Sequence, residues 1–138
     1  MANKKILIVD DDPDVRQGMH VRLKANHYDT FFAADALSSM SEARKNEPDL
    51  VILDLGLPAG DGFVVMGRFK SIPALAVIPV IVVSARDVLA NKERALKAGA
   101  KAFLQKPVDN AELLKVIRRA LGEPALTTKA IVHDLGSL

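Results

Sequence analysis

Three short runs of consecutive apolar residues constrain the fold of this chain more than any other feature. They lie at residues 6–9, 50–53 and 80–83. A strand with one solvent face alternates apolar and polar residues, whereas a strand covered on both faces is apolar at successive positions. The runs therefore predict strands of a parallel sheet that carries helices on both sides.

Other apolar residues follow a helical spacing instead. They recur every four residues at Val15, Met19 and Leu23, and again at Leu113, Ile117 and Leu121. Weaker apolar runs at residues 28–33 and 102–104 are further candidate strands. Strands that alternate with helices indicate β-α-β units, and hence an α/β fold.

Composition narrows the class of protein. The chain has 138 residues, of which 49% are hydrophobic and 26% charged, so it can form one domain with a packed core. Only 4% are aromatic and the formal net charge is +2, which argues against direct nucleic-acid binding. The absence of cysteine excludes disulfides, a thiol nucleophile and a zinc site built on cysteine. Without a signal-peptide pattern or a long apolar segment, we expect a cytoplasmic protein with no membrane partner.

Charged or hydroxyl side chains follow four of the predicted strands, at the carboxyl ends where ligands bind in parallel α/β sheets. They are Asp10, Asp11, Asp12, Asp54, Ser84 and Lys106. Acids from two strands suit a hard divalent cation such as Mg²⁺, and a lysine beside them suits a phosphoryl group. Asp54 can act as a nucleophile because carboxylates form acyl phosphates. Ser84 can donate a hydrogen bond to a phosphoryl oxygen.

Three consecutive acids follow the first strand, and their mutual repulsion requires an explanation. We expect Asp10 and Asp11 to lie at the cation site, where a metal charge relieves the repulsion. Asp12 precedes Pro13, which favours the first position of a helix, so we expect Asp12 to cap that helix.

Four motifs in register resemble the receiver domain of two-component response regulators. They read "ILIVDDDPDVR", "PDLVILDLGLPAGDG", "VIPVIVVSA" and "AGAKAFLQKP", and the resemblance covers roughly residues 4 to 121. It implies a flavodoxin-like (CheY-like) three-layer α/β/α sandwich, with five parallel strands in the order 2-1-3-4-5 and five helices. We expect a receiver domain at residues 1–122 and a C-terminal tail or linker stub at residues 123–138.

The resemblance also implies roles for the acids. Asp54 resembles the phosphoacceptor, Asp11 the direct ligand of Mg²⁺ or Mn²⁺, and Asp10 its water-mediated companion. The backbone carbonyl of Gly56 would complete the protein ligands. Gly56 has no side chain to orient an attacking water, so we expect slow dephosphorylation.

Further roles follow from the same resemblance. Lys106 resembles the lysine that binds first the carboxylate and then the phosphoryl group, and its bond to Pro107 resembles the cis peptide of the family. Ser84 resembles the switch hydroxyl and Phe103 the switch aromatic. Their movement would repack the face formed by the fourth helix, the fifth strand and the fifth helix, as a two-state population shift.

The resemblance predicts a phosphorylation-activated signalling switch. The phosphoryl donor would be a histidine kinase or a phosphotransfer protein, and the target a downstream protein or an attached output domain. Such a switch catalyses only its own aspartyl phosphorylation and dephosphorylation, and so is not an enzyme that turns over a metabolite. A phosphorylation-dependent homodimer is left open.

Two other interpretations stay open. Asp10 and Asp12 have the two-residue spacing of the acids in haloacid dehalogenase-type phosphotransferases and phosphatases, but that interpretation leaves the Asp54 motif unexplained. A receiver-like module that binds a partner without phosphorylation would not need the set of acids.

Overall fold

The computed structural model describes residues 2–57 and 62–124, and these residues form a single parallel sheet with flanking helices. In chain order the elements are β1 (Lys5–Val9), α1 (Pro13–Ala25), β2 (Asp29–Ala33), α2 (Ala36–Asn46), β3 (Leu50–Leu53), α3 (Gly62–Ser71), α4 (Pro73–Ala76), β4 (Val80–Ser84), α5 (Val88–Lys97), β5 (Ala102–Gln105) and α6 (Asn110–Leu121). The end of the predicted tail, residues 125–138, lies outside the described residues.

The five strands lie in the order β2-β1-β3-β4-β5, and every neighbouring pair is parallel. This is the flavodoxin-like order, so the predicted fold class is confirmed. β1 lies between β2 and β3, and four of its five residues are buried. That position explains why residues 6–9 are apolar on both faces of the strand.

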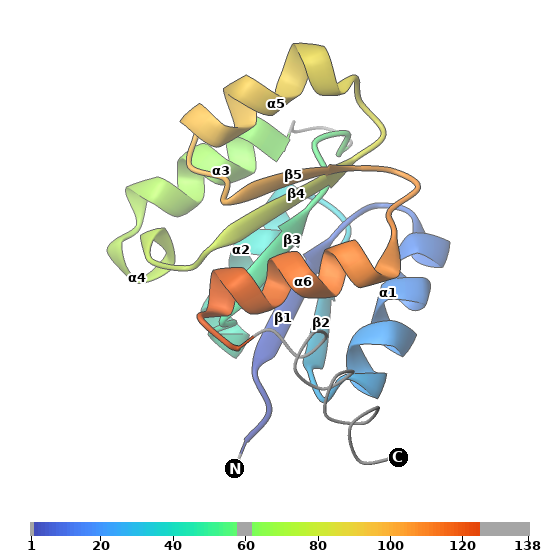
Figure 1. Ribbon diagram of the computed structural model, residues 1–138. Coiled ribbons are helices and arrows are strands. Elements are labelled where there is room, and N and C mark those ends of the chain that lie inside the picture. The colour runs from blue at the N-terminus through green and yellow to red at the C-terminus, as the bar shows by residue number, and fades with distance from the viewer. Residues whose placement is uncertain (1, 58–61, 125–138) are drawn as a thin grey trace.

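Two apolar cores cover the two faces of the sheet, as the layers in Figure 1 illustrate. On one face Ile6 and Ile8 of β1 pack with residues of α1 and α6. On the other face Leu7 and Val9 pack with residues of α2, α3, α4 and α5. Successive strand residues thus serve different cores, and the three-layer arrangement follows from the strand period of two.

The described residues contain six helices, so the expected number of five is wrong. The additional helix is α4, a single turn between α3 and β4. Pro73 stands in its first turn, where the fixed φ of proline suits a helix and the missing N–H is not needed. With this numbering, the face expected to repack on activation consists of α5, β5 and α6.

The predicted Asp12 cap is confirmed, and a second aspartate caps the last helix. The Asp12 side chain accepts a hydrogen bond from the Asp14 N–H at 2.9 Å, with Pro13 as the first residue of α1. Asp109 accepts one from the Glu112 N–H at 3.1 Å at the start of α6. Among the described helices, none is long and apolar enough to span a membrane.

Candidate functional site

Two neighbouring strands bring the acids together at the carboxyl edge of the sheet. Val9 and Leu53, the last residues of β1 and β3, are paired in register. The Asp54 N–H donates to the Val9 carbonyl at 2.9 Å, so Asp54 leaves β3 beside the point where Asp10 leaves β1. Backbone pairing, rather than any side-chain contact, therefore sets the distance between the two acids.

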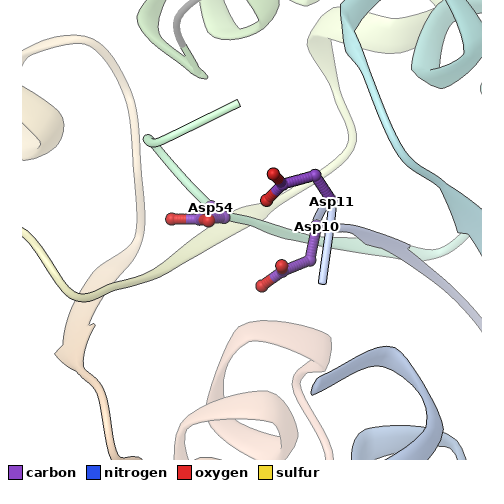
Figure 2. Close-up of side chains that lie close together, drawn as sticks. All are labelled: Asp10, Asp11 and Asp54. Carbon is purple, nitrogen blue, oxygen red and sulfur yellow. The ribbon is translucent and has the colours of Figure 1, made fainter. Parts of the chain in front are cut away.

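The three carboxylates form one cluster (Figure 2), in which one oxygen from each of Asp10, Asp11 and Asp54 lies within 4.8 Å of the others. Asp10 is 3% exposed and Asp54 is 8% exposed, whereas Asp11 lies at the surface. Three negative charges this close repel one another strongly where solvent is excluded, so the cluster requires cations to balance it.

Lys106 supplies one of these cations from the loop after β5. Its Nζ lies 2.8 Å from Asp10 Oδ2 and 3.4 Å from Asp54 Oδ2, and its side chain is 20% exposed. Desolvation would lower the pKa of Lys106, but the hydrogen bond and charge of Asp10, with a contribution from Asp54, raise that pKa above its ordinary value. The ammonium group is thus held charged between the two buried acids.

Asp10 is the most constrained of the acids. Its Oδ1 accepts from the Asp12 N–H at 2.9 Å, and its Oδ2 accepts from Lys106. Burial raises the pKa of Asp10, while the hydrogen bonds from Lys106 and from the Asp12 N–H oppose that rise. Both carboxylate oxygens already have protein donors, which suits a contact to a metal through water better than a direct one.

The Asp54 carboxylate is held by longer hydrogen bonds than that of Asp10. Its Oδ1 accepts from the Gly56 N–H at 3.1 Å, and its contact with Lys106 is long for a charged hydrogen bond. A Cβ on Gly56 would lie 3.7 Å from both Asp54 carboxylate oxygens, so the glycine leaves the approach to the carboxylate open. Gly62, at the start of α3, packs against the Asp54 backbone, and its N–H donates to the Leu55 carbonyl at 3.0 Å.

The donor set fits a hard divalent cation. Mg²⁺ binds oxygen ligands at about 2.0–2.1 Å in octahedral geometry, so opposite ligands are about 4 Å apart, close to the spread of these carboxylates. Asp11 accepts no hydrogen bond from any residue that the structure describes, and its carboxylate is therefore available as a ligand. The predicted contribution of the Gly56 carbonyl stays a prediction.

The remaining predicted residues lie on β4, on β5 and in the loop after β5. Ser84 is the last residue of β4 and is fully buried, and its hydroxyl accepts from the Arg86 N–H at 3.1 Å. The Lys106 N–H donates to the Ser84 carbonyl at 2.9 Å, which ties the two strand ends together, and the Lys106–Pro107 peptide bond is cis. Phe103 is 8% exposed, so its side chain is already inside the core. The switch movements of Ser84 and Phe103 stay predictions.

Two residues at the site were not predicted from the sequence. Arg16 of α1 donates from Nη1 to the Asp10 carbonyl at 2.7 Å, and Gly62 approaches the Asp54 backbone. The position of Arg16 in the first turn of a helix that starts beside three acids was a usable signal. Gly62 had a weaker one, since it stands among other glycines after the third strand.

Comparison with known proteins identifies the architecture. The family model described as the response regulator receiver domain matches residues 6–118. The chain is 34% identical over 130 residues to the DNA-binding dual master transcriptional regulator RpaA of Synechocystis, with 94% of this chain and 54% of that protein covered. It is 37% identical over 123 residues to the KDP operon transcriptional regulatory protein KdpE of Escherichia coli, with 89% and 53% covered. It thus spans about half the length of these two relatives.

A solved structure agrees with these matches. It is the receiver domain of the sensor histidine kinase PA1611 from Pseudomonas aeruginosa, with a magnesium ion coordinated in the active site cleft. The two structures have a TM-score of 0.80 at 26% sequence identity, with 88% of this chain and 100% of that chain covered.

Proposed function

The chain belongs to the response regulator receiver domain family, and from that premise we propose that it is a switch controlled by phosphorylation of Asp54. The observation that carries this proposal is the position of Lys106 Nζ between Asp10 and Asp54, beside a cluster of three carboxylates. A partly buried lysine and a set of metal-type ligands around one carboxylate meet the two needs of phosphoryl transfer, which are positioning and neutralisation of charge.

The proposed step is a transfer from a phosphohistidine on a partner protein. One Asp54 carboxylate oxygen forms a bond to phosphorus, while the bond from phosphorus to the histidine nitrogen breaks and leaves its electron pair on the nitrogen. Lys106 would donate to the transferred phosphoryl oxygens, and Asp11 and Asp10 would hold Mg²⁺ or Mn²⁺. When bound, the metal neutralises charge on the phosphoryl group. The acyl phosphate is later hydrolysed, which returns Asp54 to its free carboxylate.

We further propose that the signal leaves through α5, β5 and α6. Ser84 ends the strand that precedes α5, so a hydroxyl movement toward the phosphoryl group would displace the start of that helix. Ala95 is the one buried residue of the ten in α5, and Val88 and Arg94 add contacts to the core and to Phe63, so fewer contacts resist a shift of this helix than of a buried strand. Leu89 is 93% exposed on the same helix and would contact a downstream protein or an attached output domain.

The kinase or phosphotransfer partner must reach Asp54 from the carboxyl edge of the sheet. A mostly apolar hollow of about 500 Å³ lies beside Lys106, between α1 and the loop before α6. Val15 and Met19 of α1 and Val108 of the loop line it. An apolar helix of the partner would fit there, with its histidine directed toward the acids.

Incubation with acetyl phosphate and Mg²⁺, followed by intact-mass measurement, tests the proposal. We expect the wild-type chain to gain one phosphoryl group and Asp54→Asn to gain none, with Asp87→Asn, a cap at the start of α5, as the matched control that behaves as wild type. Continued consumption of acetyl phosphate by Asp54→Asn would instead indicate the phosphatase interpretation, in which Asp10 is the nucleophile. That interpretation is weakened by Asp12, whose exposed side chain caps α1 and is not part of the cluster. An unmodified wild-type chain would indicate a module that is not phosphorylated.

A further inference from the structure

Arg16 makes a contact that the proposed chemistry does not use. It belongs to the first turn of α1, and its Nη1 donates to the backbone carbonyl of Asp10 at 2.7 Å. This is a short, charge-assisted hydrogen bond in a partly buried position. It joins a rigid helix to the peptide unit at which the chain leaves β1.

The Asp10 carbonyl belongs to the same planar peptide unit as the Asp11 N–H. The orientation of that unit therefore determines where the Asp11 Cα lies and where its side chain starts. Before Asp11, the Asp10 N–H donates to the Ala33 carbonyl at 3.0 Å. After Asp11, the Asp12 N–H donates back to Asp10 Oδ1 at 2.9 Å. Asp11 itself accepts no side-chain hydrogen bond from the described residues, so its position depends on these neighbours.

We infer that Arg16 is a positioning residue for the cation site, because it fixes the peptide unit that aims Asp11 at the cluster with Asp54. The inference rests on the proposed function, since it requires that these acids bind a divalent cation. Arg16 would contact neither the cation nor the phosphoryl group and would act only through the backbone of Asp10. Groups that orient metal ligands typically change metal affinity by about 10- to 100-fold when they are removed.

The direction of the change in cation affinity on removal of Arg16 distinguishes this role from a simple effect of charge. Arg16 carries a positive charge next to a site for a cation, and by Coulomb repulsion its removal alone should tighten cation binding. If Arg16 positions Asp11, its removal should weaken cation binding despite that gain. The two explanations thus predict changes in opposite directions.

Titration with Mn²⁺, followed by water-proton relaxation, measures the affinity directly. Arg16→Met keeps the apolar stem of the side chain and removes both the donor and the charge, and we expect its Kd for Mn²⁺ to rise about tenfold or more. Arg16→Lys keeps a donor and the charge, and we expect a Kd within about threefold of wild type, since only one N–H is used. Arg22→Met removes the same charge from the exposed last turn of α1 and should bind Mn²⁺ as tightly as wild type or tighter.

A second readout distinguishes positioning from general damage. At saturating Mg²⁺, Arg16→Met should be phosphorylated by acetyl phosphate to the wild-type extent, because Asp54 and Lys106 are untouched. Should Arg16→Met fail to fold by circular dichroism, Arg16→Leu, which also lacks a donor and a charge, replaces it with the same expectation.

Mn²⁺ affinity of Arg16→Met at or above that of wild type would overturn the inference, as would Arg16→Lys binding as weakly as Arg16→Met. If the wild-type chain itself binds no Mn²⁺ at millimolar concentration, the proposed function fails, whatever the variants do.

Discussion

Gly62→Ala tests how closely α3 is packed against the strand that carries the phosphoacceptor. A Cβ on residue 62 would lie 2.6 Å from the Asp54 carbonyl oxygen and 2.7 Å from the Leu55 Cα. Both contacts are to backbone atoms, which cannot rotate away as the end of a flexible side chain can. Either α3 must withdraw or the loop after β3 must move by most of an ångström.

Overpacking of this kind typically costs about 1–3 kcal/mol. We therefore expect Gly62→Ala to lower the free energy of unfolding by about 2 kcal/mol. Gly67→Ala is the matched control, because it adds the same methyl group to the same helix at an exposed position with no atom within 4 Å of the new Cβ. It should raise the free energy of unfolding by roughly 0.5–1 kcal/mol, since alanine is the better helix former.

Urea denaturation at pH 7, followed by circular dichroism, gives both free energies. The rate of phosphorylation by acetyl phosphate at saturating Mg²⁺ should fall in Gly62→Ala and stay unchanged in Gly67→Ala, because only the former displaces the backbone of Asp54. A Gly62→Ala variant as stable as wild type would refute the packing argument. A destabilised variant with an unchanged rate would refute only the link to the phosphoacceptor.

Three further predictions concern single side chains. Lys106→Met should lower the free energy of unfolding at pH 7 by about 3 kcal/mol, because it leaves the buried Asp10 carboxylate without its cation, and added Mg²⁺ should offset part of that loss in urea titrations. A loss that Mg²⁺ does not reduce would count against a shared site. Burial and the 2.6 Å hydrogen bond to Glu123 raise the pKa of Tyr28 well above its ordinary value of about 10, so the folded state keeps the phenolic proton longer than the unfolded state does. Wild-type stability should therefore fall as the pH rises above about 10, and Tyr28→Phe should show less of that fall in thermal melts between pH 8 and 11, while losing about 1 kcal/mol at pH 7. Gly56→Asn should shorten the lifetime of the acyl phosphate, followed by intact mass after removal of the donor, because its side chain would lie over the carboxylate and could orient a water. An unchanged or longer lifetime would contradict that role.

The sheet was predictable because a strand that is buried on both faces is apolar at successive positions, and the sequence shows such runs directly. The apolar runs at residues 6–9 and 50–53 form most of β1 and all of β3, and the acids that follow these two runs meet at one edge of the sheet. The Asp12 cap was predictable for a similar reason, since its hydrogen bond spans only two residues.

Contacts that depend on packing were not predictable in this way. Lys106 Nζ lies closer to Asp10, at 2.8 Å, than to Asp54, at 3.4 Å. This small difference is between side chains that are far apart in the sequence, so no local pattern predicts it. The single turn of α4 has too few residues to show a helical period. The close approach of Gly62 depends on how α3 docks against β3, which no local pattern encodes.

The sparse packing of α5 affects how the sequence of such a switch can change during evolution. Because Ala95 is the one buried residue of α5 and Val88 also packs against the core, substitutions at the other eight positions remove little of the apolar core. Duplicated copies of this chain could therefore acquire new surface chemistry on α5, and new partners with it, without loss of folding stability. β1 has no such freedom, since its side chains serve both cores and are buried from Ile6 to Val9. In descendants of this chain, we expect many more substitutions per residue in α5 than in β1.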